Sequence, residues 1–222
     1  MRDEIHLFEA QTGLSLEYSF GAVGALRDRV LAGEPADVMV VTPAIIATLD
    51  AQQLVRADSR VDLGQIGGGI AVRVGDPLPA ISTPDELEQA LLDADEVYYA
   101  DPSVATAGAA LMRVVDLLGI GDVVRAKGHI ASGGKAAMQD MTRSTATRVL
   151  GATQISEIKS VPASILVGPY PAPLQVKTTY SAIILERTER VDDATKLIEF
   201  FSGRDFQARL AQSGFERIIA SP

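Results

Sequence analysis

The stretch that decides the fold is Val97-Tyr98-Tyr99-Ala100-Asp101-Pro102-Ser103-Val104-Ala105-Thr106-Ala107-Gly108. Its first four residues form a short apolar run of the kind found in buried strands. Its last residues are small and lead into an apolar helical pattern at Leu111, Val114, Val115 and Leu118, which ends at Gly119. The stretch therefore predicts a strand, a loop of small residues and a helix.

Two more loops of small residues stand before predicted helices. Residues 14–20 alternate between apolar and polar, which predicts a strand, and Gly21-Ala22-Val23-Gly24 then leads into a helix with Leu26 and Val30. Ala131-Ser132-Gly133-Gly134-Lys135 precedes a short helix through Met138 and Met141. Ligands of open α/β sheets bind where strands end and helices begin, and the free N–H groups of a helix start attract anions. The three loops together predict an anion site.

The rest of the chain continues the alternation of strands and helices. Predicted strands cover 38–41, 70–74, 149–152 and 180–185. Predicted helices cover 2–11, the residues after Thr42-Pro43, the residues after the capping box Thr83-Pro84-Asp85-Glu86, and a C-terminal pattern at Ala194, Leu197, Ile198 and Phe201. Gly67-Gly68-Gly69 is interpreted as a turn. This alternation predicts an α/β protein with parallel-rich sheets covered by helices on both faces.

Prolines mark two places where the chain crosses between lobes. Pro77 and Pro79 interrupt the pattern after the strand at 70–74, and Pro169-Tyr170-Pro171-Ala172-Pro173 interrupts it before the strand at 180–185. We therefore expect two lobes, one formed by residues 1–76 with 178–222 and the other by residues 77–177.

Composition excludes several classes of function. The 222 residues carry a net charge of −9, which does not suit nucleic-acid binding, and no apolar run is long enough to span a bilayer. Cysteine is absent and the two histidines, His6 and His129, lie far apart. The P-loop, dinucleotide and Gly-x-Ser-x-Gly motifs are also missing from the strand ends. We accordingly predict no catalytic residue, no cofactor and no metal.

Several segments together resemble the molybdate-type, or type II, solute-binding proteins of bacterial ABC transporters. The resemblance covers essentially the whole chain and rests on 8–13, 32–38, Asp101-Pro102 with Ala107-Gly108, 151–157, Phe200-Phe201-Ser202-Gly203 and Gly214-Phe215. It implies two Rossmann-like lobes joined by a two-crossing hinge, with a small anion held between them. It also implies a monomer in the periplasm or another extracytoplasmic location, which docks on a membrane permease without inserting.

The chain departs from the molybdate pattern in three places. The family's first strand and first ligand loop are expected upstream of Arg2, together with a signal peptide, so we expect the sequence to start late; a cytoplasmic location stays open as the alternative. The second, serine-rich loop of the family is replaced by Ala22-Val23-Gly24. A ligand tyrosine of the family is replaced by Gln154.

The resemblance also implies which residues contact the ligand. Ala22, Val23 and Gly24 would offer backbone donors from one lobe. The ligand would be contacted from the other lobe by Thr106, Ala107, Ser132, Gly133 and Gln154. Lys135 is added because it lies in a glycine loop. Since Gln154 and Lys135 can meet planar oxygens with side-chain donors, we expect a small organic acid to bind better than molybdate. The alternatives are an isomerase of small tricarboxylates on the same scaffold and a cytoplasmic effector-sensing domain.

Overall fold

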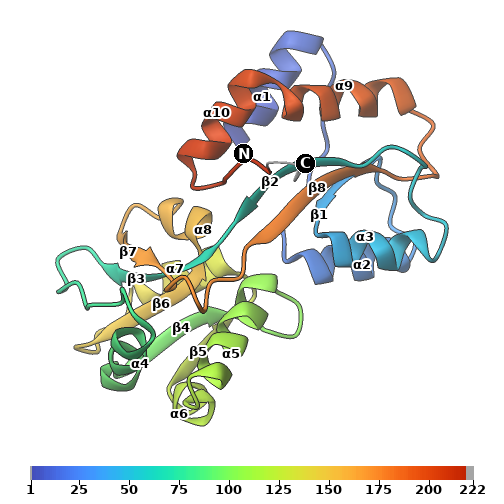
Figure 1. The fold of residues 1–222 in the computed structure, drawn as a ribbon. Coiled ribbons are helices and arrows are strands. Elements are labelled where there is room, and N and C mark those ends of the chain that lie inside the picture. Colours follow the sequence, from blue (N-terminus) through green and yellow to red (C-terminus); the bar gives the residue numbers. More distant parts are fainter. Residues whose placement is uncertain (1, 219–222) are drawn as a thin grey trace. The chain divides into compact units, whose positions relative to one another are not determined.

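The computed structural model describes residues 2–218, which fold into two compact units (Figure 1). Unit 1 takes the residues up to Gln65 and those from Thr179 onward, and unit 2 takes Ile66–Thr178. The chain therefore passes from one unit to the other at 65/66 and again at 178/179. We expected these passages at 76/77 and 177/178. The first differs because the predicted strand at 70–74 is part of the sheet of unit 2.

Unit 1 is built on a three-stranded sheet with β8 (Thr178–Ile184) in the centre. Its outer strands are β1 (Val38–Val41) and β2 (Val61–Ile66). β1 is antiparallel to β8, with Val38 opposite Ile184 and Val41 opposite Ser181. The apolar run at 38–41 is thus a strand as predicted, but it lies next to an antiparallel neighbour because the following strands in the sequence do not pair with it.

Helices cover both faces of the sheet in unit 1, which the alternation of side chains along β1 requires. Met39 and Val41 pack with α2 (Val23–Leu31) and α3 (Pro43–Asp50). Val38 and Val40 pack with α9 (Val191–Ser202) and α10 (Arg204–Gln212) on the other face.

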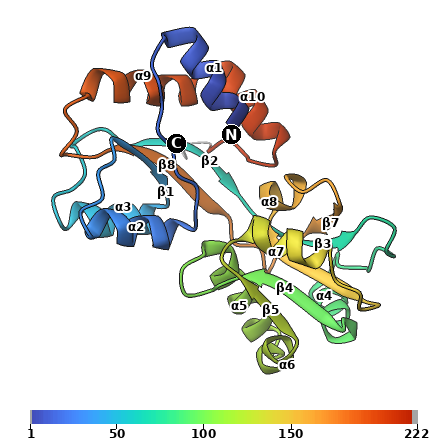
Figure 2. The same cartoon turned by 180° about the vertical axis from the view of Figure 1, so that it is seen from behind.

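The N-terminal helix of unit 1 packs against the C-terminal pair of helices (Figure 2). α1 (Arg2–Thr12) places the ring of Phe8 5.5 Å from that of Phe200, and Glu4 forms an ion pair with Arg209. As predicted, α1 ends just before Gly13, whose φ of +71° a glycine adopts without strain.

Unit 2 is built on a five-stranded sheet in the order β5-β4-β6-β3-β7. The strands are β3 (Gly68–Arg73), β4 (Glu96–Ala100), β5 (Gly128–Ala131), β6 (Val149–Gln154) and β7 (Ser164–Pro169). β4 is parallel to both β5 and β6, whereas β3 is antiparallel to both β6 and β7. Four strands therefore share one direction and only β3 opposes them. The fold-class prediction of an α/β protein is confirmed, and the sheet of unit 2 is rich in parallel strands as expected.

The two faces of this sheet carry separate apolar cores. Tyr99, Leu150 and Ala152 face α4 (Pro84–Asp93), α5 (Thr106–Leu117) and α6 (Gly121–Ala126). Tyr98 and Val149, one residue away in each strand, face α7 (Gly134–Met141) and α8 (Ile155–Lys159). The helices that follow β4 and β5 therefore cover opposite faces, and both begin at the same edge of the sheet.

Two local predictions were wrong. Residues 14–20 form no strand, and Tyr18 and Phe20 are exposed; none of the described strands of unit 1 pairs with this segment, so its backbone stays irregular. Gly67-Gly68-Gly69 is not a turn, because Gly68 and Gly69 lie inside β3. The missing side chains there make room for neighbours, since a Cβ on Gly68 would lie 2.4 Å from the ring of Tyr170.

Candidate functional site

Three parallel strands of unit 2 end side by side and define the candidate site. β5 ends at Ala131, β4 at Ala100 and β6 at Gln154. Ala100 lies opposite Ala131, and Tyr99 opposite Ala152. We call this margin of the sheet the carboxyl edge. It is where ligands bind in open α/β sheets, because helix starts with free N–H groups gather there.

The loop after β4 positions the start of α5. Asp101 accepts hydrogen bonds from the backbone N–H and the hydroxyl of Ser103, at 2.8 and 2.6 Å. These bonds hold the pKa of the Asp101 carboxyl below its ordinary value of 3.8. Ala105 is the N-cap of α5 and gives it no side-chain hydrogen bond, so the first N–H groups of the helix, at Thr106 and Ala107, are not capped by a side chain.

The start of α5 has no side-chain cap and is held instead by close packing of its backbone against β4. A Cβ on Gly108 would lie only 2.1 Å from the carbonyl oxygen of Ala100, so the backbone of α5 rests directly on the end of β4. Ala107 is buried and offers only its backbone, whereas the half-buried Thr106 offers its backbone and its hydroxyl.

The loop after β5 has a similar construction. Gly133 is the N-cap of α7, with extended backbone and no side-chain cap, and nothing lies within 4 Å of where its Cβ would be. Ser132 and Lys135 are exposed. No hydrogen bond or ion pair joins the Lys135 ammonium to another described residue. The loop thus presents backbone donors, the Ser132 hydroxyl and the ammonium of Lys135, which has no ion pair with a described residue.

Gln154 is the last residue of β6 and the N-cap of α8. It is 7% exposed and lies opposite Gly68 of β3. Thr106, Ala107, Ser132, Gly133, Lys135 and Gln154 are therefore brought to one edge of one sheet. They combine helix-start N–H groups, an amide and a cation, which is a donor-rich set suited to an anion.

The three remaining predicted contacts lie in unit 1. Ala22 is the N-cap of α2, gives no side-chain cap, and accepts a hydrogen bond from Leu26 N at 3.0 Å through its carbonyl. Val23 and Gly24 are the first helical residues, half-buried and buried. This loop repeats the uncapped helix start found twice in unit 2.

Several residues at the carboxyl edge were missed in the sequence. Thr153 is fully buried and donates its hydroxyl to Glu157 at 2.5 Å. A Cβ on Gly134 would meet both side chains, at 1.9 and 2.0 Å, so a glycine is required where α7 begins. The glycine pair at 133–134 was the available signal for this close approach, but the sequence does not show which side chains fill the space.

Gln175 was also missed, although it fixes one end of β3. Its side-chain oxygen accepts from Gly68 N at 3.0 Å and its amide donates to Gly68 O at 2.8 Å. The glutamine therefore holds both polar backbone groups of one residue. Its long distance in sequence from Gly68 leaves no local pattern that predicts the contact.

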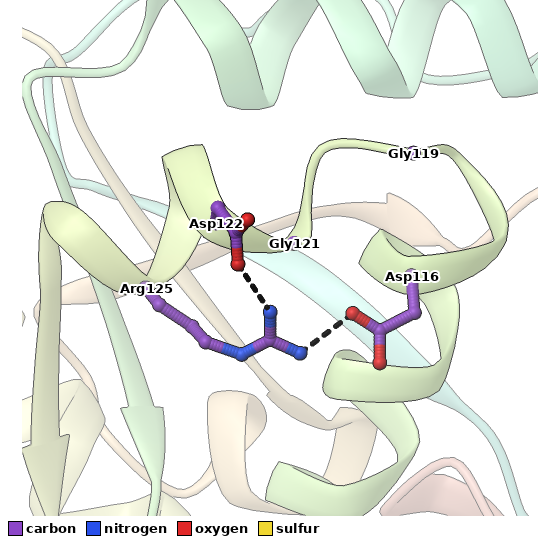
Figure 3. A pocket seen from close by; sticks show the side chains of 5 residues that line it. All are labelled: Asp116, Gly119, Gly121, Asp122 and Arg125. Atoms are coloured by element: carbon purple, nitrogen blue, oxygen red, sulfur yellow. Dashed lines mark hydrogen bonds and ion pairs between the residues drawn. The ribbon is translucent and has the colours of Figure 1, made fainter.

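A pocket of about 220 Å³ lies elsewhere in unit 2, at the end of α5 and the start of α6 (Figure 3). Arg125 reaches across it, donating to Asp116 at 2.6 Å and to Asp122 at 3.1 Å. Gly119 and Gly121 complete the lining. Because its one cation is already neutralised by two carboxylates, this pocket is not suited to the anion predicted from the loops.

Among the side chains that the structure describes, those of residues 4–218, no three His, Cys, Asp or Glu are grouped to hold a metal ion. Within that same range, no helix combines the length and the apolar character needed to cross a membrane.

Known proteins resemble this chain in both sequence and fold. An aconitate isomerase from Pseudomonas sp is 30% identical over 237 residues, an alignment that covers 100% of this chain and 85% of that protein. The periplasmic molybdate-binding protein of Azotobacter vinelandii matches with a TM-score of 0.81 at 20% identity, covering 98% of this chain and 94% of that one. The sulfate-binding protein of Mycobacterium tuberculosis matches with a TM-score of 0.76 at 18% identity, and the match covers 97% of this chain and 82% of that one.

A family model agrees with these matches. The model described as "Bacterial extracellular solute-binding protein" covers residues 1–216. The molybdate- and sulfate-binding structures support the type II fold that the sequence predicted. The chain belongs to the bacterial extracellular solute-binding protein family.

Proposed function

We propose that this chain is the solute-binding component of an ABC-type uptake system and that its ligand is a small organic polycarboxylate. The observation that carries the proposal is the pair of neighbouring helix starts at Ala105 and Gly133, neither capped by a side chain, beside Gln154. Each such start favours an anion by about 0.3–1 kcal/mol when exposed, and by more when water is excluded.

The predicted contact residues of the two units, taken separately, favour carboxylates over molybdate. Ala22, Val23 and Gly24 supply backbone donors but no hydroxyl, so the donors that a tetrahedral oxyanion would use in the family are reduced. The Gln154 amide and the Lys135 ammonium extend beyond the backbone and suit planar oxygens spread over a larger ligand. The name of the isomerase relative points to a tricarboxylate as a ligand accepted on this scaffold.

An extracytoplasmic location and docking on a membrane permease are part of the same proposal. They are supported by the family to which the chain belongs. The test is genetic: deletion of the gene should abolish uptake of the ligand by cells, and the protein should be found in the fraction released from the envelope. A deletion that leaves uptake intact would contradict the transport role.

Isomerisation of a tricarboxylate is the second candidate function, and the 30% identical isomerase is the observation that favours it. Moving a double bond requires a group that takes a proton from carbon and returns one. Glu157 is a carboxylate at the carboxyl edge, where it accepts a hydrogen bond from Thr153 and lies beside Gly134, whereas the Asp101 carboxylate is held by Ser103. Glu157 is the residue we would assign as the proton acceptor.

Binding and isomerisation can be separated in one series of measurements. Calorimetry with cis-aconitate, trans-aconitate, citrate, molybdate and sulfate identifies the ligand, and proton NMR of each aconitate isomer in D2O detects turnover. We expect micromolar or tighter binding of a carboxylate without turnover. Submicromolar molybdate binding with no response to the carboxylates would refute the proposed ligand. Turnover that is lost in Glu157→Gln would establish the isomerase instead.

A further inference from the structure

A fourth strand also ends at the carboxyl edge, and the residue after it is Tyr170. β6 and β7 are both antiparallel to β3, so they share a direction and end at the same edge. β7 ends at Pro169 opposite Gly69, and Tyr170 N donates to Gly68 O at 3.1 Å. Gln154 lies opposite Gly68 from the other side. Tyr170 and Gln154 therefore flank the same glycine.

The ring of Tyr170 lies over that glycine. A Cβ on Gly68 would be 2.4 Å from Cε2 and 3.0 Å from Cζ of the ring, so the ring occupies the space that a side chain at 68 would fill. Alternation along β3 puts this space on the same face as Ile70, which packs with Leu111 of α5. Alternation along β6 puts Gln154 on that face too, two residues after Ala152. The phenol and the amide thus share one face, at the edge where α5 begins.

The hydroxyl of Tyr170 has no partner for its hydrogen bond among the described residues, although the side chain is only 3% exposed. A buried hydroxyl without a partner costs stability, and such groups are rare in folded proteins. Burial raises the pKa of Tyr170, so the phenol stays neutral and keeps its proton to donate. A phenylalanine would fill the same space without that cost, which makes the hydroxyl a group in need of an external acceptor.

We infer that the Tyr170 hydroxyl is a specificity-determining donor of the anion site, forming a hydrogen bond to a ligand carboxylate oxygen next to the Gln154 amide. The inference rests on the proposed function. The two hydrogen bonds from the Gln175 side chain to the backbone of Gly68 hold β3 beneath the Tyr170 ring. The hydroxyl is therefore in place before the ligand arrives. The phenol hydroxyl can donate to one oxygen of a ligand carboxylate.

The test compares Tyr170→Phe with Tyr99→Phe by calorimetry and thermal unfolding, using trans-aconitate, cis-aconitate and citrate as probes. Tyr99 is a matched control, because it is 1% exposed in the same core but lies against Gly128, at the start of β5. We expect Tyr170→Phe to raise the Kd of the wild type's best carboxylate by about 10- to 100-fold, the loss of a hydrogen bond to a charged acceptor. Its ligand-free Tm should be unchanged or higher. Tyr99→Phe should bind within about twofold of wild type.

The outcomes separate this inference from the proposed function. If wild type binds none of the carboxylates, both are overturned. If wild type binds one and Tyr170→Phe binds it equally well, the inference alone is overturned. If Tyr170→Phe loses both affinity and stability, near-UV difference spectra at saturating ligand decide: a tyrosine signal absent only from Tyr170→Phe supports the inference, and an unchanged signal overturns it.

Discussion

The two edges of the sheet in unit 2 use polar side chains in opposite ways. At the edge where β4 begins, which we call the amino edge, Glu96 accepts from Tyr98 at 2.8 Å and from Ser144 at 2.6 Å. Arg73, at the end of β3, donates to the carbonyls of Ser144 and Ala146 at 2.7 and 2.9 Å. Polar groups there satisfy one another.

At the carboxyl edge, several hydrogen-bond donors have no described acceptor or side-chain cap. The N-caps Ala105 and Gly133 offer no side chain to their helices, Lys135 has no ion pair with a described residue, and the Tyr170 hydroxyl has no described partner. Burial of polar groups therefore does not by itself mark a binding site. A set of donors that the fold holds in place but does not satisfy is the more specific sign.

The largest effect on the free energy of unfolding is expected at the start of α5, which is held by backbone packing and not by a side-chain cap. Gly108→Ala should destabilise the protein by about 3 kcal/mol, because its Cβ would meet the backbone of Ala100. Helix propensity alone predicts the opposite sign, a gain of about 1 kcal/mol. Urea unfolding measures the change, with Ala109→Gly, on the exposed side of α5, as the control that should lose about 1 kcal/mol. A stabilised Gly108→Ala would show that the helix start is not packed as described.

At the amino edge, Glu96→Ala should cost about 2 kcal/mol of stability, because two hydroxyls lose a charged acceptor. Ligand affinity should not change. Denaturant titrations and calorimetry on the same preparations measure both. A loss of affinity equal to that of a carboxyl-edge variant would remove the distinction between the two edges.

The same carboxylate gives a pH dependence whose sign is fixed. Hydrogen bonds from Ser144 and then Tyr98 lower the folded-state pKa of Glu96 below its ordinary value of 4.5. The stability that the ionised Glu96 carboxylate contributes is therefore present above pH 4.5 and is lost as the pH falls through the folded-state pKa. In Glu96→Gln, the fall in Tm with acid should be shallower than in wild type. Equal slopes would show that this carboxyl does not take part in acid unfolding.

Gly133→Asp tests whether an uncapped helix start is kept free for the ligand. An aspartate N-cap should stabilise the ligand-free protein by about 0.5–1 kcal/mol, yet its charge should weaken carboxylate binding by about tenfold. Gly133→Asn provides the matched control, since it caps the helix without the charge. If the two variants bind the ligand equally well, the anion does not lie near α7.

The smallest effect is expected at Lys135. Lys135→Gln should weaken carboxylate binding by about two- to threefold, because the exposed ammonium is screened by solvent and salt. Lys135→Arg should preserve affinity, and the difference between the two variants should shrink at high salt. Equal affinity at low salt would remove Lys135 from the site.

Much of the carboxyl edge could be predicted because its signals are local. A strand that runs directly into small residues and a helix marks its own end, which located the loops at 101–108 and 131–135. The individual contact residues in these loops came from the family resemblance and stay a prediction. Tyr170 and Gln175 could not be found in this way. Their importance arises from contact with Gly68, about a hundred residues earlier, and side chains that meet across strands leave no periodic pattern.

The errors in the fold have the same origin. The alternation at 14–20 satisfies the local rule for a strand, but a strand exists only where a neighbour accepts its hydrogen bonds. The strand at 38–41 was predicted correctly, but its antiparallel pairing with β8 could not be, because β8 comes from the far end of the sequence. Local patterns specify elements, and pairing between distant segments specifies their arrangement.

The central place of β8 in unit 1 has a consequence for the order of assembly during synthesis. β1 and β2 both neighbour β8, not each other, so this sheet lacks its middle strand until residues 178–184 have left the ribosome. Ile66–Thr178 is continuous and is completed first. In a nascent chain, all residues of unit 2 are therefore present before β8 is. Until β8 is synthesised, β1 and β2 lack the neighbour to which their backbone N–H and C=O groups bond. That interval is when chaperones or export factors would find the chain most accessible.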